Sequence, residues 1–355
     1  MQPKQDIRFC TSPDGVRLAI ATTGSGPPLI RVSTWMSHLE CDQREEDTWA
    51  AVQAFSQDHT FVRYDSRGCG LSDRRIPSLE FDNLVNDLGA VVDAHGQEPM
   101  PLFGMSCGVP IAIAYAARHP ERVSRLILLN GYGRAYFSAK HPEPSVLEEA
   151  NLLLHSARVG WNNDRSAFRQ VFVAQLLGNA DSDMRRRIDE RMRLSMTPEM
   201  AERHLRSNYS MDVKAECAQV QCPTLVLHAR GDQMVNFDQG RKLAAWIPGA
   251  RFVPLESDSH VLLGGQPAAK QFFSEVRSFL GLDEKTLANP THLSQRQTEI
   301  LACVAHGQTD KQIARDLGLS PRTVEMHVAG AMKALQCNTR AQAVHRATHE
   351  GLLAA

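Results

Sequence analysis

Short runs of apolar and β-branched residues alternate with helical patterns over most of the chain. Strand-like runs occupy residues 7–12, 16–24, 28–33, 61–67, 100–103 and 123–131. Helices are expected near Glu46–Phe55 and Leu79–Ala94, and a third directly after residue 108. Strands that alternate with helices are typical of an α/β sheet, and uninterrupted apolar runs are typical of buried parallel strands. We therefore expect a parallel sheet covered by helices.

This alternation is interrupted between about residues 135 and 220, where the strand signals stop. Helical stretches at residues 145–161 and 166–177 take over, which implies an all-helical insertion. The alternation then resumes with strands at residues 222–230 and 250–257 and with helices near Phe237–Trp246 and Ala268–Leu280. The sheet is therefore expected to continue after the insertion.

The character of the chain changes again at Gly281. Residues 282–290 are polar and contain Asn289-Pro290, which predicts a linker. Residues 291–355 carry four helix-start signals, namely Ser294-x-x-Gln297, Thr309-x-x-Gln312, Ser320-Pro321 and Thr339-x-x-Gln342. They predict four short helices, with a tight turn at Gly318-Leu319-Ser320 of the kind found in a helix-turn-helix.

Composition fits a large folded core with an appendage. The 355 residues are 43% hydrophobic and 22% charged, which indicates a globular protein without extensive disorder. The eight cysteines are scattered without C-x-x-C pairs, so neither a zinc site nor a disulfide framework is expected, and reduced thiols are. The N-terminus has no apolar leader region, and no run approaches the roughly 20 apolar residues of a membrane span. We expect a cytoplasmic protein that does not enter a membrane.

The pattern with the clearest chemistry is GMSCG at residues 104–108, a G-x-S-x-G sequence between a strand-like and a helix-like run. This context is typical of a nucleophile elbow, whose sharp turn exposes the hydroxyl of the central serine, here Ser106. A serine needs a base to take its proton and an acid to orient that base. Asp232 and His260 each follow a late predicted strand, at the end of the sheet where such folds bind ligands.

Four segments together resemble the α/β-hydrolase family. They are GMSCG, HARGDQMV, SDSHVLL and the YDSRGCGLSD sequence at residues 64–73, which fits the family pattern D-x-R-G-x-G-x-S. By this resemblance residues 1–281 form an α/β-hydrolase-like domain with a helical cap at about residues 135–220. Many relatives have His-Gly in the loop after the third strand, whereas this chain has Ser33-Thr34 there.

The resemblance implies a role for each residue of the site. Ser106 is the nucleophile, His260 is the base, and Asp232 is the acid that orients it. The oxyanion hole is expected from the backbone N–H groups of Cys107 and, by its position in the loop, Trp35. The resemblance implies neither a metal ion nor a cofactor.

Other interpretations of these residues remain open from the sequence. Ser106 also fits a chance or decayed match, and some proteins of this fold are receptors that keep the three residues mainly to bind a ligand. Cys107 is expected to fill the elbow rather than to be the nucleophile, and His38 and Glu40 are expected at the surface. The large apolar residues of the insertion are interpreted as cap core, with substrate contact as the alternative: Trp161, Phe168, Phe172 and Met211. Residues 185–187, three arginines flanked by acids, are expected on a solvated face.

The C-terminal segment resembles the LuxR-type DNA-binding domain. The resemblance is carried by Gly307, Lys311-Gln312-Ile313-Ala314, Leu317, Ser320, Thr323-Val324, His327, Lys333, Leu335 and Arg340. It implies that the helix at about residues 321–336 enters the major groove of double-stranded DNA. The residues expected at base edges are Arg322, Thr323 and Met326, and those expected at phosphates are Lys311, Lys333 and Arg340.

Charge limits how this domain binds. Residues 291–355 contain seven Lys or Arg against five Asp or Glu, and the whole chain has a net charge of −1. Glu325 stands where a basic residue is common, and it would repel phosphate unless it faces away or accepts a hydrogen bond from a cytosine. One copy is expected to bind DNA weakly, so a homodimer on two half-sites is expected. A four-helix interaction module without a DNA role is the alternative.

Both halves together predict a transcriptional regulator whose hydrolase-like domain senses a small ester, lactone or acyl ligand. Whether this domain also cleaves the ligand is open. The competing hypothesis is an active serine esterase in which the C-terminal domain has an accessory role.

Overall fold

The computed structural model describes residues 4–135, 137, 144–163, 166–178, 180–282, 293, 295–335, 337, 339–349 and 353. The chain divides into two compact units, Met1–Leu280 and Gly281–Ala355. Except for residue 282, the expected linker lies outside the described residues. None of the helices in the described part is long and apolar enough to cross a bilayer.

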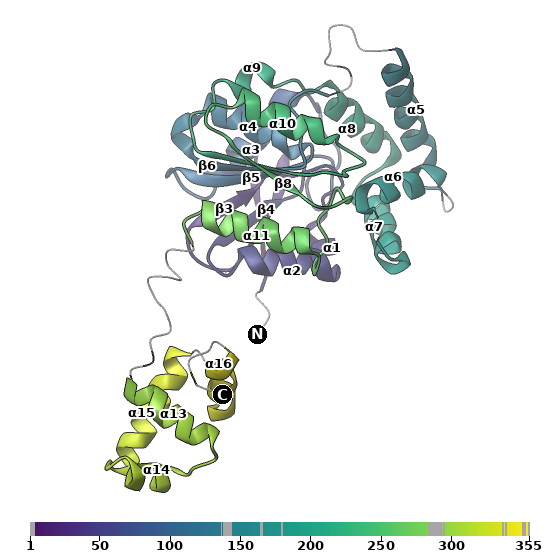
Figure 1. Cartoon of the computed structure of the whole chain (residues 1–355). Coiled ribbons are helices and arrows are strands. Elements are labelled where there is room, and N and C mark those ends of the chain that lie inside the picture. Colours follow the sequence, from purple (N-terminus) through teal and green to yellow (C-terminus); the bar gives the residue numbers. More distant parts are fainter. Residues whose placement is uncertain are drawn as a thin grey trace. The chain divides into compact units, whose positions relative to one another are not determined.

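The larger unit is built on an eight-stranded sheet (Figure 1). In spatial order its strands are β1 (Asp6–Thr11), β2 (Arg17–Thr23), β4 (Thr60–Tyr64), β3 (Pro28–Arg31), β5 (Met100–Met105), β6 (Val123–Leu129), β7 (Thr224–Ala229) and β8 (Arg251–Leu255). The pairs from β4 to β8 are parallel, as expected. The pairs β1–β2 and β2–β4 are antiparallel, so the sheet is mostly parallel with two antiparallel pairs at one edge. Residues 12–16 are too few for the crossover that a parallel β1–β2 pair would need.

Helices cover both faces of this sheet (Figure 1). One face carries α3 (Phe81–Asp93), α4 (Gly108–Arg118) and α10 (Phe237–Trp246), and the other carries α2 (Glu46–Phe55) and α11 (Pro267–Phe279). On the second face Phe55 stacks on Phe61 with ring centroids 4.7 Å apart, and Phe272 packs against Phe55 from α11. Helices α2 and α10 begin and end at the residues expected. The short helix α1 (Leu39–Arg44), which precedes α2, was not expected because six residues are too few to show a period.

The segment after β4 is held by buried polar contacts of Asp65 and Arg67. Arg67 is fully buried and donates to Asp87 at 2.7 and 2.6 Å and to Asp14 at 2.6 and 3.1 Å. Gly70 has φ +50°, and a Cβ there would lie 2.1 Å from Oδ2 of Asp65. Only glycine fits this position, because the carboxylate of Asp65 accepts the backbone N–H groups that hold the turn.

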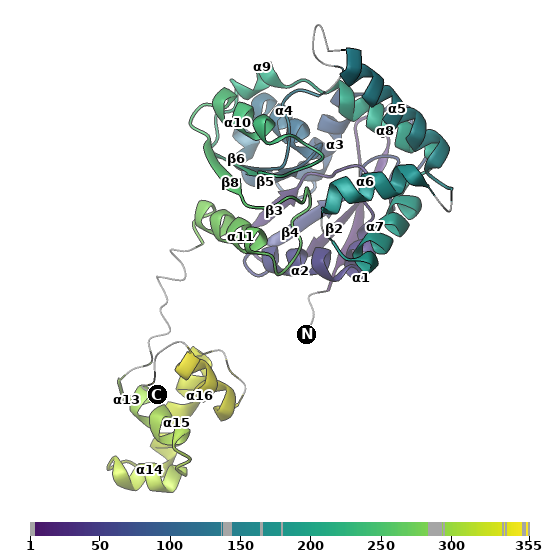
Figure 2. The same ribbon diagram turned by 45° about the vertical axis from the view of Figure 1, so that its right-hand side comes forward.

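Within the described residues between β6 and β7, four helices form the cap (Figures 1 and 2). They are α5 (Pro144–Gly160), α6 (Ala167–Leu177), α7 (Ser182–Ser195) and α8 (Pro198–Ser210), and the short α9 (Lys214–Cys217) follows them. Ser166, Asp181 and Thr197 cap the first turns of α6, α7 and α8, because each side chain accepts the backbone N–H three residues on. The two views show the cap helices gathered at one end of the sheet.

The smaller unit is helical and has its own apolar core. Its helices are α13 (Gln295–Ala305), α14 (Asp310–Asp316), α15 (Pro321–Ala334) and α16 (Arg340–His349). Gln312 accepts the backbone N–H of Thr309 at 2.8 Å, and Thr339 accepts that of Gln342 at 3.2 Å, as the predicted helix starts require. Ser294 of the first predicted start lies outside the described residues. The side chains that close the core are Ile300, Leu301, Ile313, Val324, Val328 and Leu335.

Candidate functional site

Ser106 lies at the sharp turn between β5 and α4. It has φ +52°, a left-handed conformation that non-glycine residues rarely adopt. The flanking glycines make this turn possible: a Cβ at Gly104 would lie 3.0 Å from the Gly108 carbonyl oxygen, and one at Gly108 would lie 3.1 Å from the Val32 carbonyl oxygen. The G-x-S-x-G sequence therefore forms the strained strand-to-helix turn that was expected of it.

Asp232 and His260 come together at the carboxyl ends of β7 and β8. Nδ1 of His260 lies 2.7 Å from Oδ2 of Asp232, and both side chains are buried. The second carboxylate oxygen accepts the backbone N–H groups of Met234 at 2.8 Å and Val235 at 2.9 Å. These three hydrogen bonds fix the Asp232 carboxylate, which in turn orients the imidazole ring.

The opposite nitrogen of this ring has the state that a base requires. Because Nδ1 donates its proton to Asp232, Nε2 of neutral His260 carries a lone pair. Nε2 is buried and has no hydrogen-bond partner in the described part of the chain. Asn130 holds the backbone on both sides of the site, since its amide donates to the His260 carbonyl at 2.6 Å and accepts the Ala229 N–H at 2.8 Å.

A second histidine, His228, lies beside Asp232 and was not found from the sequence. Its Nε2 is 2.9 Å from the Val235 carbonyl oxygen and 3.7 Å from Oδ2 of Asp232. Because a carbonyl can only accept, Nε2 carries the proton of His228. Burial lowers the pKa of this imidazole. His228 therefore stays neutral, and it does not compete with His260 for a charged hydrogen bond to the Asp232 carboxylate.

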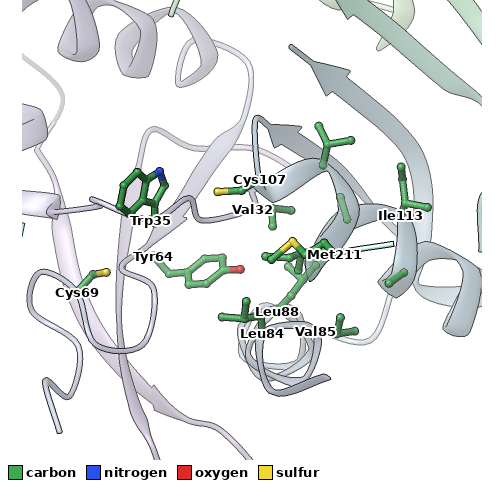
Figure 3. Close-up of a cluster of buried hydrophobic side chains, with 14 of the residues drawn as sticks. Val32, Trp35, Tyr64, Cys69, Leu84, Val85, Leu88, Cys107, Ile113 and Met211 are labelled. Carbon is green, nitrogen blue, oxygen red and sulfur yellow. The ribbon is translucent and has the colours of Figure 1, made fainter. Parts of the chain in front are cut away.

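Trp35 and Cys107, the two residues expected to form the oxyanion hole, lie close to each other. The Cys107 sulfur points toward the segment that carries Trp35 (Figure 3). Burial raises the pKa of the Cys107 thiol to about 11, and a hydrogen bond from the Trp35 backbone opposes this rise. The thiol is therefore protonated at neutral pH and unsuited to be the nucleophile. The Trp35 N–H is directed at this sulfur, within the elbow itself.

A cavity of about 360 Å³ opens onto these residues. Ser106, His260 and Trp35 line it, and so do the apolar side chains of α2, α11 and the cap. The cap contributes Leu176, Leu177, Met184, Ile188 and Met192. Its volume is in the range of small-molecule sites.

The cap residues that line the cavity differ from those considered in the sequence. Trp161 and Phe172 are buried against Trp35, with ring centroids 5.7 and 5.2 Å from it, so they pack the cap against the loop that carries Trp35. The cavity is instead lined by one face of α7, at the i, i+4, i+8 positions Met184, Ile188 and Met192. The spacing of these three residues is present in the sequence. It was not recognised as an apolar face because the residues between them are charged. Of the arginines at residues 185–187, Arg186 is exposed, whereas Arg185 and Arg187 are half-buried.

In the smaller unit, α14 and α15 are joined by residues 317–320, with Gly318 at φ +65°. Ser320 caps α15 by accepting the backbone N–H of Thr323 at 3.1 Å. The residues expected at base edges, Arg322 and Met326, are exposed on α15. Met326 is 62% exposed, which is unusual for a large apolar residue. Thr323 is half-buried, and its hydroxyl lies 2.8 Å from that of Ser320.

The residues expected to contact phosphate differ in whether another side chain already pairs with them. Lys311 is exposed on α14. Arg340 is paired with Asp310 through two hydrogen bonds of 2.6 and 2.8 Å, and this pairing raises its pKa. The side chain of Lys333 lies outside the described part. A phosphate would have to compete with Asp310 for Arg340.

No group of three or more His, Cys, Asp or Glu side chains within the described ranges is arranged to hold a metal ion. All eight cysteines are free thiols.

Two family models match the chain. The model described as the alpha/beta hydrolase fold matches residues 44–264, and the one described as bacterial regulatory proteins of the luxR family matches residues 291–347. Among curated proteins, the "AB hydrolase superfamily protein YisY" of Bacillus subtilis is 24% identical over 261 residues, which cover 71% of this chain and 91% of that protein. The pyrrolizixenacetamide deacetylase of Xenorhabdus hominickii is 24% identical over 264 residues, or 72% and 92% of the two chains.

Solved structures show the same fold. The enol-lactonase of Burkholderia xenovorans LB400 superimposes with a TM-score of 0.64 at 23% identity, over 77% of this chain and all of that one. The esterase of Exiguobacterium antarcticum gives 0.64 at 18% identity, over 77% and 98% of the two chains. At these identities the likeness establishes the fold of the larger unit.

Proposed function

Since the chain belongs to the α/β-hydrolase fold family and carries a luxR-family DNA-binding domain at its C-terminus, we propose that it is a ligand-responsive transcriptional regulator. Its hydrolase-like domain binds a small ester, lactone or related acyl compound, and its C-terminal domain binds double-stranded DNA in the cytoplasm. The observation that carries the ligand part is the cavity that Ser106, His260 and Trp35 share. A regulator needs an input, and a pocket of this kind supplies one.

The arrangement of these residues also supports cleavage of the ligand. In the proposed step the Ser106 hydroxyl attacks the ligand carbonyl while Nε2 of His260 takes its proton. The Asp232 carboxylate, 2.7 Å from Nδ1, stabilises the imidazolium that forms. Backbone N–H groups at the elbow donate hydrogen bonds to the carbonyl oxygen and so stabilise the negative charge that develops on it. His260 then returns the proton to the leaving alkoxide, and water releases the acyl group by the reverse sequence.

The DNA part of the proposal rests on α15. Its first turns present Arg322 and Met326 to solvent, as a helix that enters a major groove must. Because the domain is only weakly basic, two copies are needed for tight binding, and we propose a homodimer on two half-sites. A ligand changes this binding only if it has unequal affinity for two states of the protein.

Hydrolysis by the full-length protein tests the cleavage step. We expect turnover of short-chain p-nitrophenyl esters and covalent labelling by a fluorophosphonate, both absent in Ser106→Ala. Selection from a random duplex library tests the DNA step, with loss of the selected sequence preference in Arg322→Ala. Absence of labelling in the wild-type protein would leave a receptor rather than an enzyme, and absence of any selected sequence would refute the regulator.

The second candidate function is a serine esterase with an accessory C-terminal domain. It is favoured by the left-handed φ of Ser106, because strain of this kind is costly and is typical of turns kept for catalysis. Turnover of an ester that has no effect on DNA binding would support it over the regulator.

A further inference from the structure

The cavity contains a cluster of charged side chains that the proposed reaction does not use. Arg31, Asp42, Arg63 and Arg191 line its wall, and Glu45 lies behind them. Arg31 is the last residue of β3 and is paired with Phe103 of β5, two residues before the elbow strand ends. It also lies close enough to the elbow for its charge to act on the Cys107 thiol.

Two of the three arginines in this cluster have carboxylate partners. Asp42 accepts hydrogen bonds from Arg63 and Arg191, one on each oxygen, and Glu45 lies 3.1 Å from Nε of Arg191. These side chains are buried or nearly so. The two carboxylates therefore balance the charges of Arg63 and Arg191.

Arg31 has no such partner. Its side chain forms neither a hydrogen bond nor an ion pair with any other residue in the part of the chain that the structure describes. Burial lowers the pKa of its guanidinium, and the charges of Arg191 and Arg63 lower it further, whereas the Asp42 and Glu45 carboxylates act on it in the opposite direction without contacting it. Arg31 is half-buried in the cavity wall, and a cation that is partly removed from water favours an anionic partner that enters the cavity.

The remaining charged groups of the cavity do not supply this partner. Asp65 lines the cavity, but burial raises the pKa of its carboxyl to about 7, and its Oδ2 accepts the N–H groups of Leu39 and Leu71. Asp47 accepts the N–H of Gly264 at 3.0 Å. Among the described residues, Arg31 is thus the guanidinium of the inner cavity wall that no carboxylate contacts, and Lys270 is a second positive charge at an exposed position.

We propose that Arg31 binds a carboxylate on the ligand, so that the compound held at Ser106 is an acyl ester or lactone with a second, free carboxylate. A guanidinium matches a carboxylate by two parallel hydrogen bonds. A single guanidinium without a carboxylate contact in the inner wall fits a monoanion better than a phosphate dianion, and the apolar walls fit the hydrocarbon between the two groups. This inference rests on the proposed function, because it names the class of ligand for the same cavity.

Matched ester pairs test the proposal. Mono-p-nitrophenyl esters of the straight-chain diacids from succinate to suberate are compared with the same esters whose remote carboxyl is methylated. For the best chain length we expect wild-type kcat/KM to favour the free carboxylate by about 10- to 100-fold, mainly through KM. Arg31→Met should bring this ratio close to one while it leaves the methylated ester unchanged. Arg31→Lys should retain part of the preference, and Arg8→Met, at an exposed arginine, should retain all of it.

Thermal unfolding separates this inference from the hydrolysis step. Monomethyl esters of the same diacids should raise the Tm of the wild-type protein more than the dimethyl esters do, and this difference should vanish in Arg31→Met. That result would uphold the carboxylate site even if neither ester is hydrolysed. Arg31→Met itself should keep or raise the Tm of the free protein, because it removes an unpaired charge. If no chain length gives a preference for the carboxylate in either assay, or if Arg31→Met and Arg31→Lys both retain it, the proposal is wrong.

Discussion

Replacing Asp232 by asparagine separates the orientation of His260 from the folding of the site. Oδ1 of Asp232 accepts the two backbone N–H groups of Met234 and Val235, and Oδ2 accepts only Nδ1 of His260. In Asp232→Asn the carbamoyl oxygen can keep both backbone bonds. Its NH₂ group then faces Nδ1, which must accept, so the proton of His260 moves to Nε2 and the base is lost.

The structure sets the size of both effects. One hydrogen bond to a charged group is replaced by one between neutral groups, so the free energy of unfolding should fall by about 1 to 2 kcal/mol. The rate constant for labelling of Ser106 by a fluorophosphonate should fall by about 10³- to 10⁴-fold, the size seen when a triad acid is replaced by its amide. Asp238→Asn, which removes a half-exposed ion pair with Lys242 at the start of α10, is the control: it should leave the labelling rate unchanged and lower the free energy of unfolding by less than Asp232→Asn does. If Asp232→Asn is labelled at the wild-type rate, the pair has only a structural role and our account of the base is wrong.

Two further predictions concern charged groups elsewhere. Because the native pKa of Asp65 is raised to about 7 and its unfolded value is near 4, native Asp65 binds its proton more tightly, and this stabilisation is lost as pH rises from 4 to 7. Asp65→Asn should therefore gain stability relative to the wild type, by about 2 to 3 kcal/mol between pH 5 and pH 8, in urea unfolding at these two pH values; a constant difference would refute the shift. Asp310→Asn should free Arg340 and tighten DNA binding about 3- to 10-fold, with a steeper salt dependence in fluorescence anisotropy. Unchanged or weaker binding would mean that Arg340 does not meet phosphate.

Much of this fold is encoded in local patterns. Strand and helix alternation, the polar stretch after Gly281 and the helix-start signals of residues 291–355 depend on nearby residues only, and they predicted most elements. Strands β1 and β2 were predicted but their antiparallel direction was not, and the short α1 was missed, because strand direction and one-turn helices leave no periodic signal.

The site divides in the same way. Ser106, Asp232 and His260 were predicted because each stands in a recognisable segment, and the 2.7 Å contact between Asp232 and His260 agrees with their expected pairing. His228 and Arg31 were not predicted. The role of each depends on residues distant in the sequence. For Arg31 it depends on the pairing of Asp42 with two other arginines. No local pattern can show that a charge is left without a partner.

The central claim is that the cavity at Ser106 controls DNA binding. The most direct test is the affinity of the full-length protein for its selected DNA sequence, before and after a fluorophosphonate fills the cavity at Ser106, with Ser106→Ala as the control. We expect the Kd of the wild-type protein for this DNA to change by at least about fivefold on labelling, the lower end of allosteric coupling. The Kd of Ser106→Ala should not change. An equal wild-type Kd before and after complete labelling would contradict the claim.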